Sequence, residues 1–215
     1  MKIDKNDKLL MIGDSITDVG RARPVGEGLF DAYGSGYVNL VKGLLDCSYP
    51  ELAIRVVNMG CSGDTVRQLK ERWQTDVIDQ DSQWLSIMIG INDVWRQFDL
   101  PKQLENHIML DEYEATLCEL IGKVRPSLKG LVLMTPYYIE PCTDDAMRAR
   151  MDQYGAIIRK LAKKYDAIFV DTQKAMDGVL EHFHSSYLAW DRVHPNVSGH
   201  MTIAKAFLKA IDFEF

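Results

Sequence analysis

The sequence has no long apolar run and no excess of basic residues. No stretch of its 215 residues is apolar for long enough to span a bilayer. Residues 1–8 are polar and lead directly into an apolar segment, so they do not resemble a signal peptide. With 25 basic and 31 acidic residues the net charge is −6, and lysine and arginine form no block. These absences argue against a membrane or a nucleic acid as the partner, and we expect a cytoplasmic protein.

The four cysteines also lack a pattern. They stand far apart, at positions 47, 61, 118 and 142, without a C-x-x-C pair or a histidine at zinc-ligand spacing. In a protein without a secretory segment, this favours free thiols over a disulfide framework. Asp14, Asp18 and Asp93 remain as carboxylates for a metal ion, but no histidine or cysteine accompanies them at fixed spacing. We therefore expect no metal site.

Short apolar segments alternate with helical patterns along the whole chain. Strands are predicted at residues 9–12, 54–58, 84–89, 131–134 and 167–170. Helices are predicted at residues 37–45, 65–77, 111–124, 144–165 and 198–210. Because parallel neighbours need crossover connections, this alternation predicts a parallel sheet covered by helices on both faces. No linker or repeat interrupts it, so we expect one domain over residues 1–215.

The alternation alone leaves the strand order open. A flavodoxin-like order, 2-1-3-4-5, would place the turn after the first strand near the point where the sheet reverses its winding. Ligands of open α/β sheets bind there, outside the carboxyl ends of the strands. Ser15 follows the first strand in the segment 13–15 (Gly-Asp-Ser), at such a position. The same segment is also a common turn and helix cap.

Three further polar clusters follow predicted strands or precede the last helix. In residues 58–65 two glycines let backbone N–H groups approach a ligand closely. In residues 90–93 the side-chain amide of Asn92 can donate to a developing negative charge. Asp191 and His194 have the i, i+3 spacing that lets a carboxylate hold one imidazole nitrogen and leave the other as a base.

Together these groups are the parts that acyl transfer requires: a nucleophile, an oriented base and oxyanion donors. Ser62 and Cys61 are alternative nucleophiles in the second cluster. A G-x-S-x-G elbow would be the signature of a nucleophile there, but Asp64 occupies the place of the final glycine. Ser15 is therefore the preferred nucleophile.

In their order along the chain, the four clusters resemble the conserved blocks of the SGNH hydrolases, the GDSL-type esterase superfamily. Residues 13–23, 89–97, 131–140 and 189–195 further resemble bacterial acetylxylan esterases of that superfamily. The resemblance implies a three-layer α/β/α, flavodoxin-like domain with a five-stranded parallel sheet in the order 2-1-3-4-5. It also implies ester hydrolysis without a metal or another cofactor.

Carried over residue by residue, the resemblance makes Ser15 the nucleophile, His194 the general base and Asp191 its orienting carboxylate. The backbone N–H groups of Ser15 and Gly63 and the side chain of Asn92 would form the oxyanion hole. Gly60 is the alternative to Gly63.

The resemblance implies an acetylated saccharide as the substrate, and the absent signal peptide favours short xylo-oligosaccharides inside the cell. Side chains near the catalytic blocks are candidates for binding it: Trp95, Arg96, Tyr137, Tyr138 and Trp190. A lysophospholipase or acyl-thioesterase of the same superfamily is the alternative enzyme, and a catalytically silent carbohydrate-binding module is a third reading. Phe213 and Phe215 at the carboxyl terminus hint at self-association into a homo-oligomer.

Overall fold

A five-stranded parallel sheet forms the centre of the molecule. The computed structural model describes residues 1–215. The strands are β1 (Lys8–Gly13), β2 (Arg55–Asn58), β3 (Trp84–Met88), β4 (Gly130–Met134) and β5 (Ile168–Val170). Their order is β2-β1-β3-β4-β5, and every neighbouring pair is parallel. This confirms the predicted fold and order, and it places β1, which leads to Ser15, between two other strands.

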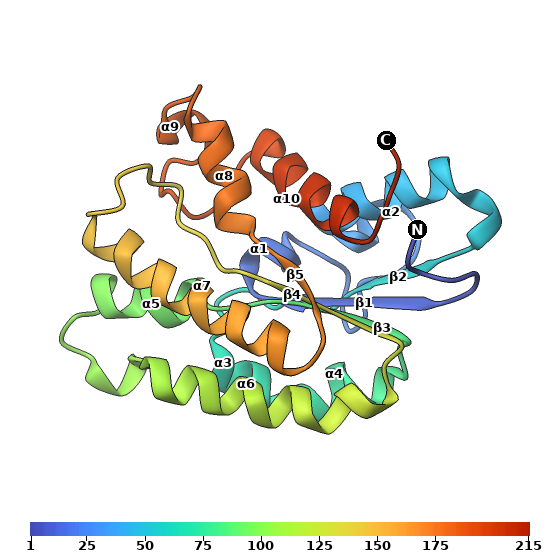
Figure 1. The fold of residues 1–215 in the computed structure, drawn as a ribbon, viewed down its shortest axis with the longest axis horizontal. Helices are drawn as coiled ribbons and strands as arrows, with labels where there is room; N and C mark the ends of the chain where they lie inside the picture. Colours follow the sequence, from blue (N-terminus) through green and yellow to red (C-terminus); the bar gives the residue numbers. More distant parts are fainter.

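Helices cover both faces of the sheet (Figure 1). They are α1 (Ser15–Asp18), α2 (Tyr37–Ser48), α3 (Val66–Glu71), α4 (Trp73–Asp76), α5 (Ile91–Asp99), α6 (Leu110–Val124), α7 (Ala146–Lys164), α8 (Thr172–Leu180), α9 (Ser185–Leu188) and α10 (Val197–Ala210). Short 3-10 turns lie at Phe30–Tyr33, Pro50–Leu52, Ile78–Gln80, Leu104–Asn106 and Arg125–Ser127. In Figure 1, α2, α8 and α10 lie on one side of the sheet, and α3, α4 and α6 lie on the other. None of the helices combines the length and the apolar character needed to cross a membrane.

The strands are apolar throughout because both faces of the sheet are buried. Leu9, Leu10, Met11 and Ile12 of β1 have no exposed surface, and Leu10 is in register with β2 on one side and β3 on the other. The buried hydrophobic side chains form one continuous core that reaches from Ile3 to Phe213. Burial of this apolar surface, at about 25 cal/mol per Å², is the main force that holds the layers together.

The structure divides one predicted helix and contains four helices that the sequence did not predict. The helix predicted over residues 65–77 is two helices, α3 and α4, which meet at Arg72. The backbone leaves the helical region at Arg72, whose guanidinium bonds Gly13, Met59 and Asp64. Helices α5 and α8 and the four-residue helices α1 and α9 were not predicted. In α8 the buried positions include the polar Thr172 and Gln173, so no apolar stripe marks that helix.

Candidate active site

Ser15 lies at the carboxyl end of β1, as the first residue of α1. The side chain of Asp14 caps this short helix by accepting the Ile16 N–H at 3.0 Å. Gly13 is required just before it: a Cβ there would stand 2.3 Å from the Met88 carbonyl oxygen. Because Gly13 has no side chain, the end of β1 packs closely against β3. This close packing fixes the position of the Ser15 backbone.

The hydroxyl of Ser15, the imidazole of His194 and the carboxylate of Asp191 form a continuous hydrogen-bonded line. Ser15 Oγ lies 2.8 Å from His194 Nε2, and His194 Nδ1 lies 2.6 Å from Asp191 Oδ2. With the Nδ1 proton donated to Asp191, Nε2 is left as an acceptor for the serine proton. The arrangement can therefore generate a serine nucleophile.

Asp191 also stabilises the turn from Asp191 to His194 as a hydrogen-bond acceptor. Its Oδ1 accepts the N–H groups of Val193 and His194, both at 2.9 Å. Burial by itself would raise the pKa of Asp191, but the hydrogen bonds from His194 and Val193 outweigh it and hold the pKa below its usual value. The carboxylate therefore stays ionised opposite the imidazole.

The three N–H groups predicted to form the oxyanion hole each have a hydrogen that no group of the chain accepts. The backbone N–H groups of Ser15 and Gly63 donate to no group in the chain. One amide hydrogen of Asn92 goes to the Asp64 carbonyl oxygen at 2.9 Å, and the other is unused. The Gly60 N–H, in contrast, already donates to the side chain of Asn58 at 2.9 Å. This difference favours Gly63 over Gly60 as an oxyanion donor.

Two charged side chains hold the glycine-rich loop beside Ser15: Asp18, which the sequence offered only as a carboxylate for a metal ion, and Arg72, which no sequence pattern marked. Asp18 Oδ2 accepts the N–H and the hydroxyl of Ser62, at 3.0 and 2.7 Å, and pairs with Arg23 at 2.7 Å. Burial would raise the pKa of Asp18, but these bonds lower it. Arg72 donates to the Gly13 carbonyl at 2.9 Å and to the Asp64 carboxylate at 2.5 Å. No sequence pattern signals such links, because they join distant loops.

The alternative nucleophiles have no histidine as a base. The hydroxyl of Ser62 donates to Asp18, and no histidine touches it. Burial and the Asp64 carboxylate raise the pKa of the Cys61 thiol, which disfavours its reactive thiolate.

The three carboxylates considered for a metal ion serve other roles. Asp14 caps α1, Asp18 holds Ser62, and Asp93 accepts the Val66 N–H at 3.0 Å. No group of three or more histidine, cysteine or acidic side chains is arranged to hold a metal ion. Burial raises the pKa values of Asp14 and Asp93 to about 7.

The aromatic and basic residues predicted to bind a substrate have different surroundings. The Trp95 ring lies 5.9 Å from the His194 ring, and the guanidinium of Arg96 lies 5.1 Å from the Trp95 ring. Trp190 is 94% exposed. Trp95 therefore lies against the base of the triad, Arg96 lies against Trp95, and Trp190 is an exposed neighbour of Asp191 in the sequence.

Tyr137 and Tyr138 follow β4. In place of the predicted substrate contact, Tyr137 is fully buried, and its hydroxyl donates to the Val193 carbonyl at 3.2 Å. Burial keeps its ring out of reach of a ligand, so Tyr137 supports the turn that carries His194. Tyr138 is half-buried, and its backbone N–H donates to Gln173 at 2.8 Å.

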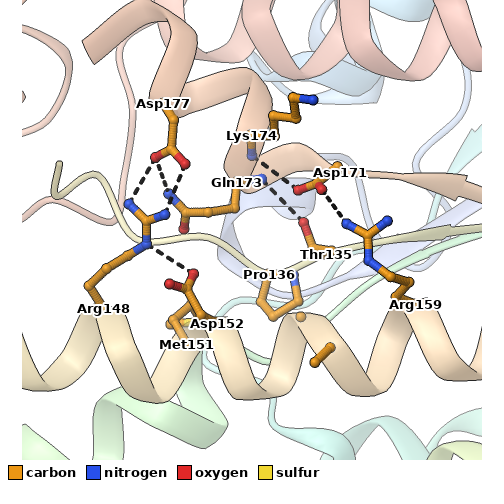
Figure 2. Close-up of a pocket in the computed structure, with 12 residues that line it drawn as sticks. Thr135, Pro136, Arg148, Met151, Asp152, Arg159, Asp171, Gln173, Lys174 and Asp177 are labelled. Carbon is orange, nitrogen blue, oxygen red and sulfur yellow. Dashed lines mark hydrogen bonds and ion pairs between the residues drawn. The ribbon is translucent and has the colours of Figure 1, made fainter. Parts of the chain in front are cut away.

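The site opens to the surface: the side chains of His194 and Asp191 are 46% and 38% exposed. A cavity of about 240 Å³ adjoins it, with Gly63 and Arg96 in its wall. Another, of about 280 Å³, lies between α7 and α8 and does not include the triad (Figure 2). Its side chains mostly bond one another, as Arg148 does with Asp152 and Asp177. The side chains that line this second cavity therefore connect α7 and α8, and we do not regard the cavity as a candidate site.

A flavodoxin-like sheet with a serine, a histidine and an aspartate joined at its carboxyl edge defines an α/β serine hydrolase. Within that class the family is clear: the GDSL-like Lipase/Acylhydrolase family model matches residues 11–201, and the chain belongs to this family.

Relatives extend the match over the whole chain. An acetylxylan esterase of Geobacillus stearothermophilus is 59% identical over 100% of this chain and 98% of its own length. Its crystal structure, under the name Axe2, superposes with a TM-score of 0.98 over the same shares of the two chains. Three further structures of that enzyme, equally similar, are described as catalytic mutants with the changes S15A, D191A and H194A. This chain has the same residue types at the same three numbers.

Proposed function

We propose that this protein is a serine esterase that removes acetyl groups from acetylated xylo-oligosaccharides or related sugars. The observation that carries the proposal is the line from Ser15 Oγ through His194 to Asp191, with contacts of 2.8 and 2.6 Å. The acetylxylan esterase that covers the whole chain supports the choice of substrate.

The mechanism has two steps. His194 Nε2 takes the Ser15 proton as the oxygen attacks the ester carbonyl, and the free N–H donors of Ser15, Gly63 and Asn92 bind the resulting oxyanion. His194 then gives this proton to the ester oxygen of the sugar as its bond to the acetyl carbon breaks, which releases the sugar hydroxyl and leaves an acetyl-serine. Water, deprotonated by the same nitrogen, attacks the acetyl-serine; the bond from the acetyl carbon to Ser15 Oγ breaks, His194 returns the proton to Ser15, and acetate is released. One such oxyanion donor typically contributes about 2.7–4 kcal/mol to the transition state.

Replacement of the nucleophile tests the activity. We expect Ser15→Ala to abolish hydrolysis of 4-nitrophenyl acetate with an unchanged circular dichroism spectrum. Ser62→Ala loses only a bond to Asp18 and should retain turnover well above that of Ser15→Ala. A Ser15→Ala protein that keeps the wild-type rate would rule the mechanism out. A serine-directed phosphonate that fails to label the wild type would favour the catalytically silent carbohydrate-binding module.

A series of acyl chains tests the substrate. We expect kcat/KM to fall steeply from acetyl to octanoyl 4-nitrophenyl esters, and acetylated xylo-oligosaccharides to be deacetylated. The opposite trend would indicate the lysophospholipase or acyl-thioesterase alternative.

We further infer one catalytic domain over residues 1–215, supported by the continuous core. A cytoplasmic location and a homo-oligomer are also part of the proposal. Phe30, Trp190 and Phe215 support self-association, because each is exposed by 70% or more. Fractionation of the source cells and light scattering of the purified protein test these two points.

A further inference from the structure

The turn that carries the proposed base has an unfavourable backbone. Arg192, between Asp191 and His194, has φ of 60°, in the left-handed region that residues with a Cβ rarely adopt. Such a residue persists only where its surroundings determine the conformation. The relevant contacts must therefore come from the rest of the chain.

The segment after β4 supplies these contacts, all to the two residues between Asp191 and His194. The Ile139 N–H donates to the Arg192 carbonyl at 2.9 Å, and the Tyr137 hydroxyl donates to the Val193 carbonyl at 3.2 Å. The guanidinium of Arg192 pairs with the carboxylate of Glu140. Residues 137–140 thus bind both the backbone of the turn and its Arg192 side chain.

Glu140 is itself immobilised. Its side chain is 11% exposed and also accepts the Cys142 N–H at 2.9 Å. Its carbonyl oxygen accepts Arg148 Nη1 at 2.6 Å. Arg148 extends from α7 to Asp177 of α8, at 2.8 and 2.9 Å, as Figure 2 shows. A hydrogen-bonded chain therefore runs from the helices α7 and α8 to the turn.

We propose that Glu140 and Arg192 are positioning residues, whose ion pair holds the Asp191–His194 turn so that Nε2 stays aligned with the Ser15 hydroxyl. The inference rests on the proposed esterase function. Neither residue touches the reacting atoms of the proposed mechanism; both act through the turn. Because misplacement of a catalytic group by about 1 Å can cost 10²-fold in rate, the pair should affect kcat more than KM.

The test compares Glu140→Gln, Arg192→Gln, Arg192→Lys and the double glutamine variant on 4-nitrophenyl acetate. Glutamine at 140 keeps the acceptor for the Cys142 N–H, so folding is expected to survive. We expect each glutamine variant to lower kcat about tenfold, with KM changed by less than about twofold. The double variant should be no slower than the singles, since both remove one interaction. Arg192→Lys keeps the charge and should recover part of the rate.

Lys160→Gln is the matched control, because it removes an exposed ion pair with Glu114 away from the turn. It should leave kcat unchanged. Losses that add in the double variant, a rise in KM alone, or an unchanged kcat in Glu140→Gln would each overturn the positioning role. These results are distinct from failure of the proposed function, which would show as an inactive wild type.

Discussion

Asp191→Asn is the most direct probe of how the proposed triad works. Asparagine keeps the oxygen that accepts the N–H groups of Val193 and His194, so the turn should remain folded. It places an NH2 group where Asp191 Oδ2 now lies, 2.6 Å from His194 Nδ1. Nδ1 must then become the acceptor, and the ring proton moves to Nε2. A protonated Nε2 cannot accept the proton of Ser15.

The structure sets the expected size of this effect. In serine proteases the same exchange lowers kcat about 10⁴-fold, although the geometry is unchanged. Asp191 is 38% exposed here, so water can offset part of the wrong tautomer. We therefore expect a loss of about 10³-fold to 10⁴-fold, equivalent to about 4–5.5 kcal/mol of transition-state stabilisation. The loss should appear in kcat, measured with saturating 4-nitrophenyl acetate, and little in KM.

Asp191→Ala provides the comparison, because it removes the orienting oxygen and both turn acceptors without imposing a tautomer. Far-ultraviolet circular dichroism and the midpoint of thermal unfolding establish that each variant is folded. If Asp191→Asn is folded and turns over within tenfold of the wild type, the tautomer argument is wrong.

Three further predictions concern the loop beside Ser15 and the buried carboxylates. Gly63→Ala should lower kcat about tenfold or more, because φ is +88° and an alanine there would shift the backbone N–H that binds the oxyanion. The protein should stay folded, because no atom lies within 4 Å of the added Cβ. Steady-state kinetics and thermal unfolding measure these two effects. Gly60→Ala should instead lower the midpoint of thermal unfolding, since its Cβ would stand 2.3 Å from the Asp18 backbone nitrogen; an unchanged midpoint would contradict the close contact. Burial raises the pKa of Asp93 to about 7 in the folded chain. Between about pH 4 and pH 7 the folded chain therefore keeps a proton on Asp93 that the unfolded chain has lost. The free energy of unfolding should fall as the pH rises through this range. Urea unfolding at pH 5 and pH 8 should show a smaller fall for Asp93→Asn, and equal falls would refute this.

The reacting groups were accessible from sequence because their chemistry restricts residue type and spacing. Asp191 and His194 stand three residues apart because a single turn must hold the carboxylate against the imidazole. Ser15 follows a short apolar segment, and such a segment predicts a buried strand. The alternation predicted that the sheet is parallel, and the family resemblance implied the order of its strands. Tyr137 was misassigned because an aromatic residue after a strand has the same pattern whether it faces a ligand or the core. Helix α8 was missed because its buried face is partly polar.

What sequence could not show is how the loops are held relative to one another. Arg72 donates to Gly13, which precedes the nucleophile, and to Asp64, whose carbonyl oxygen holds Asn92. Its side chain is only 15% exposed, and burying an ion pair has a desolvation penalty that often cancels its attraction. A contribution to the free energy of unfolding is therefore a weak explanation for the Arg72–Asp64 ion pair. Its geometry offers a better one: a single guanidinium bonds both the end of β1 and the glycine-rich loop at residues 60–64, and so fixes the distance between them, as we propose that Glu140 fixes the turn of His194.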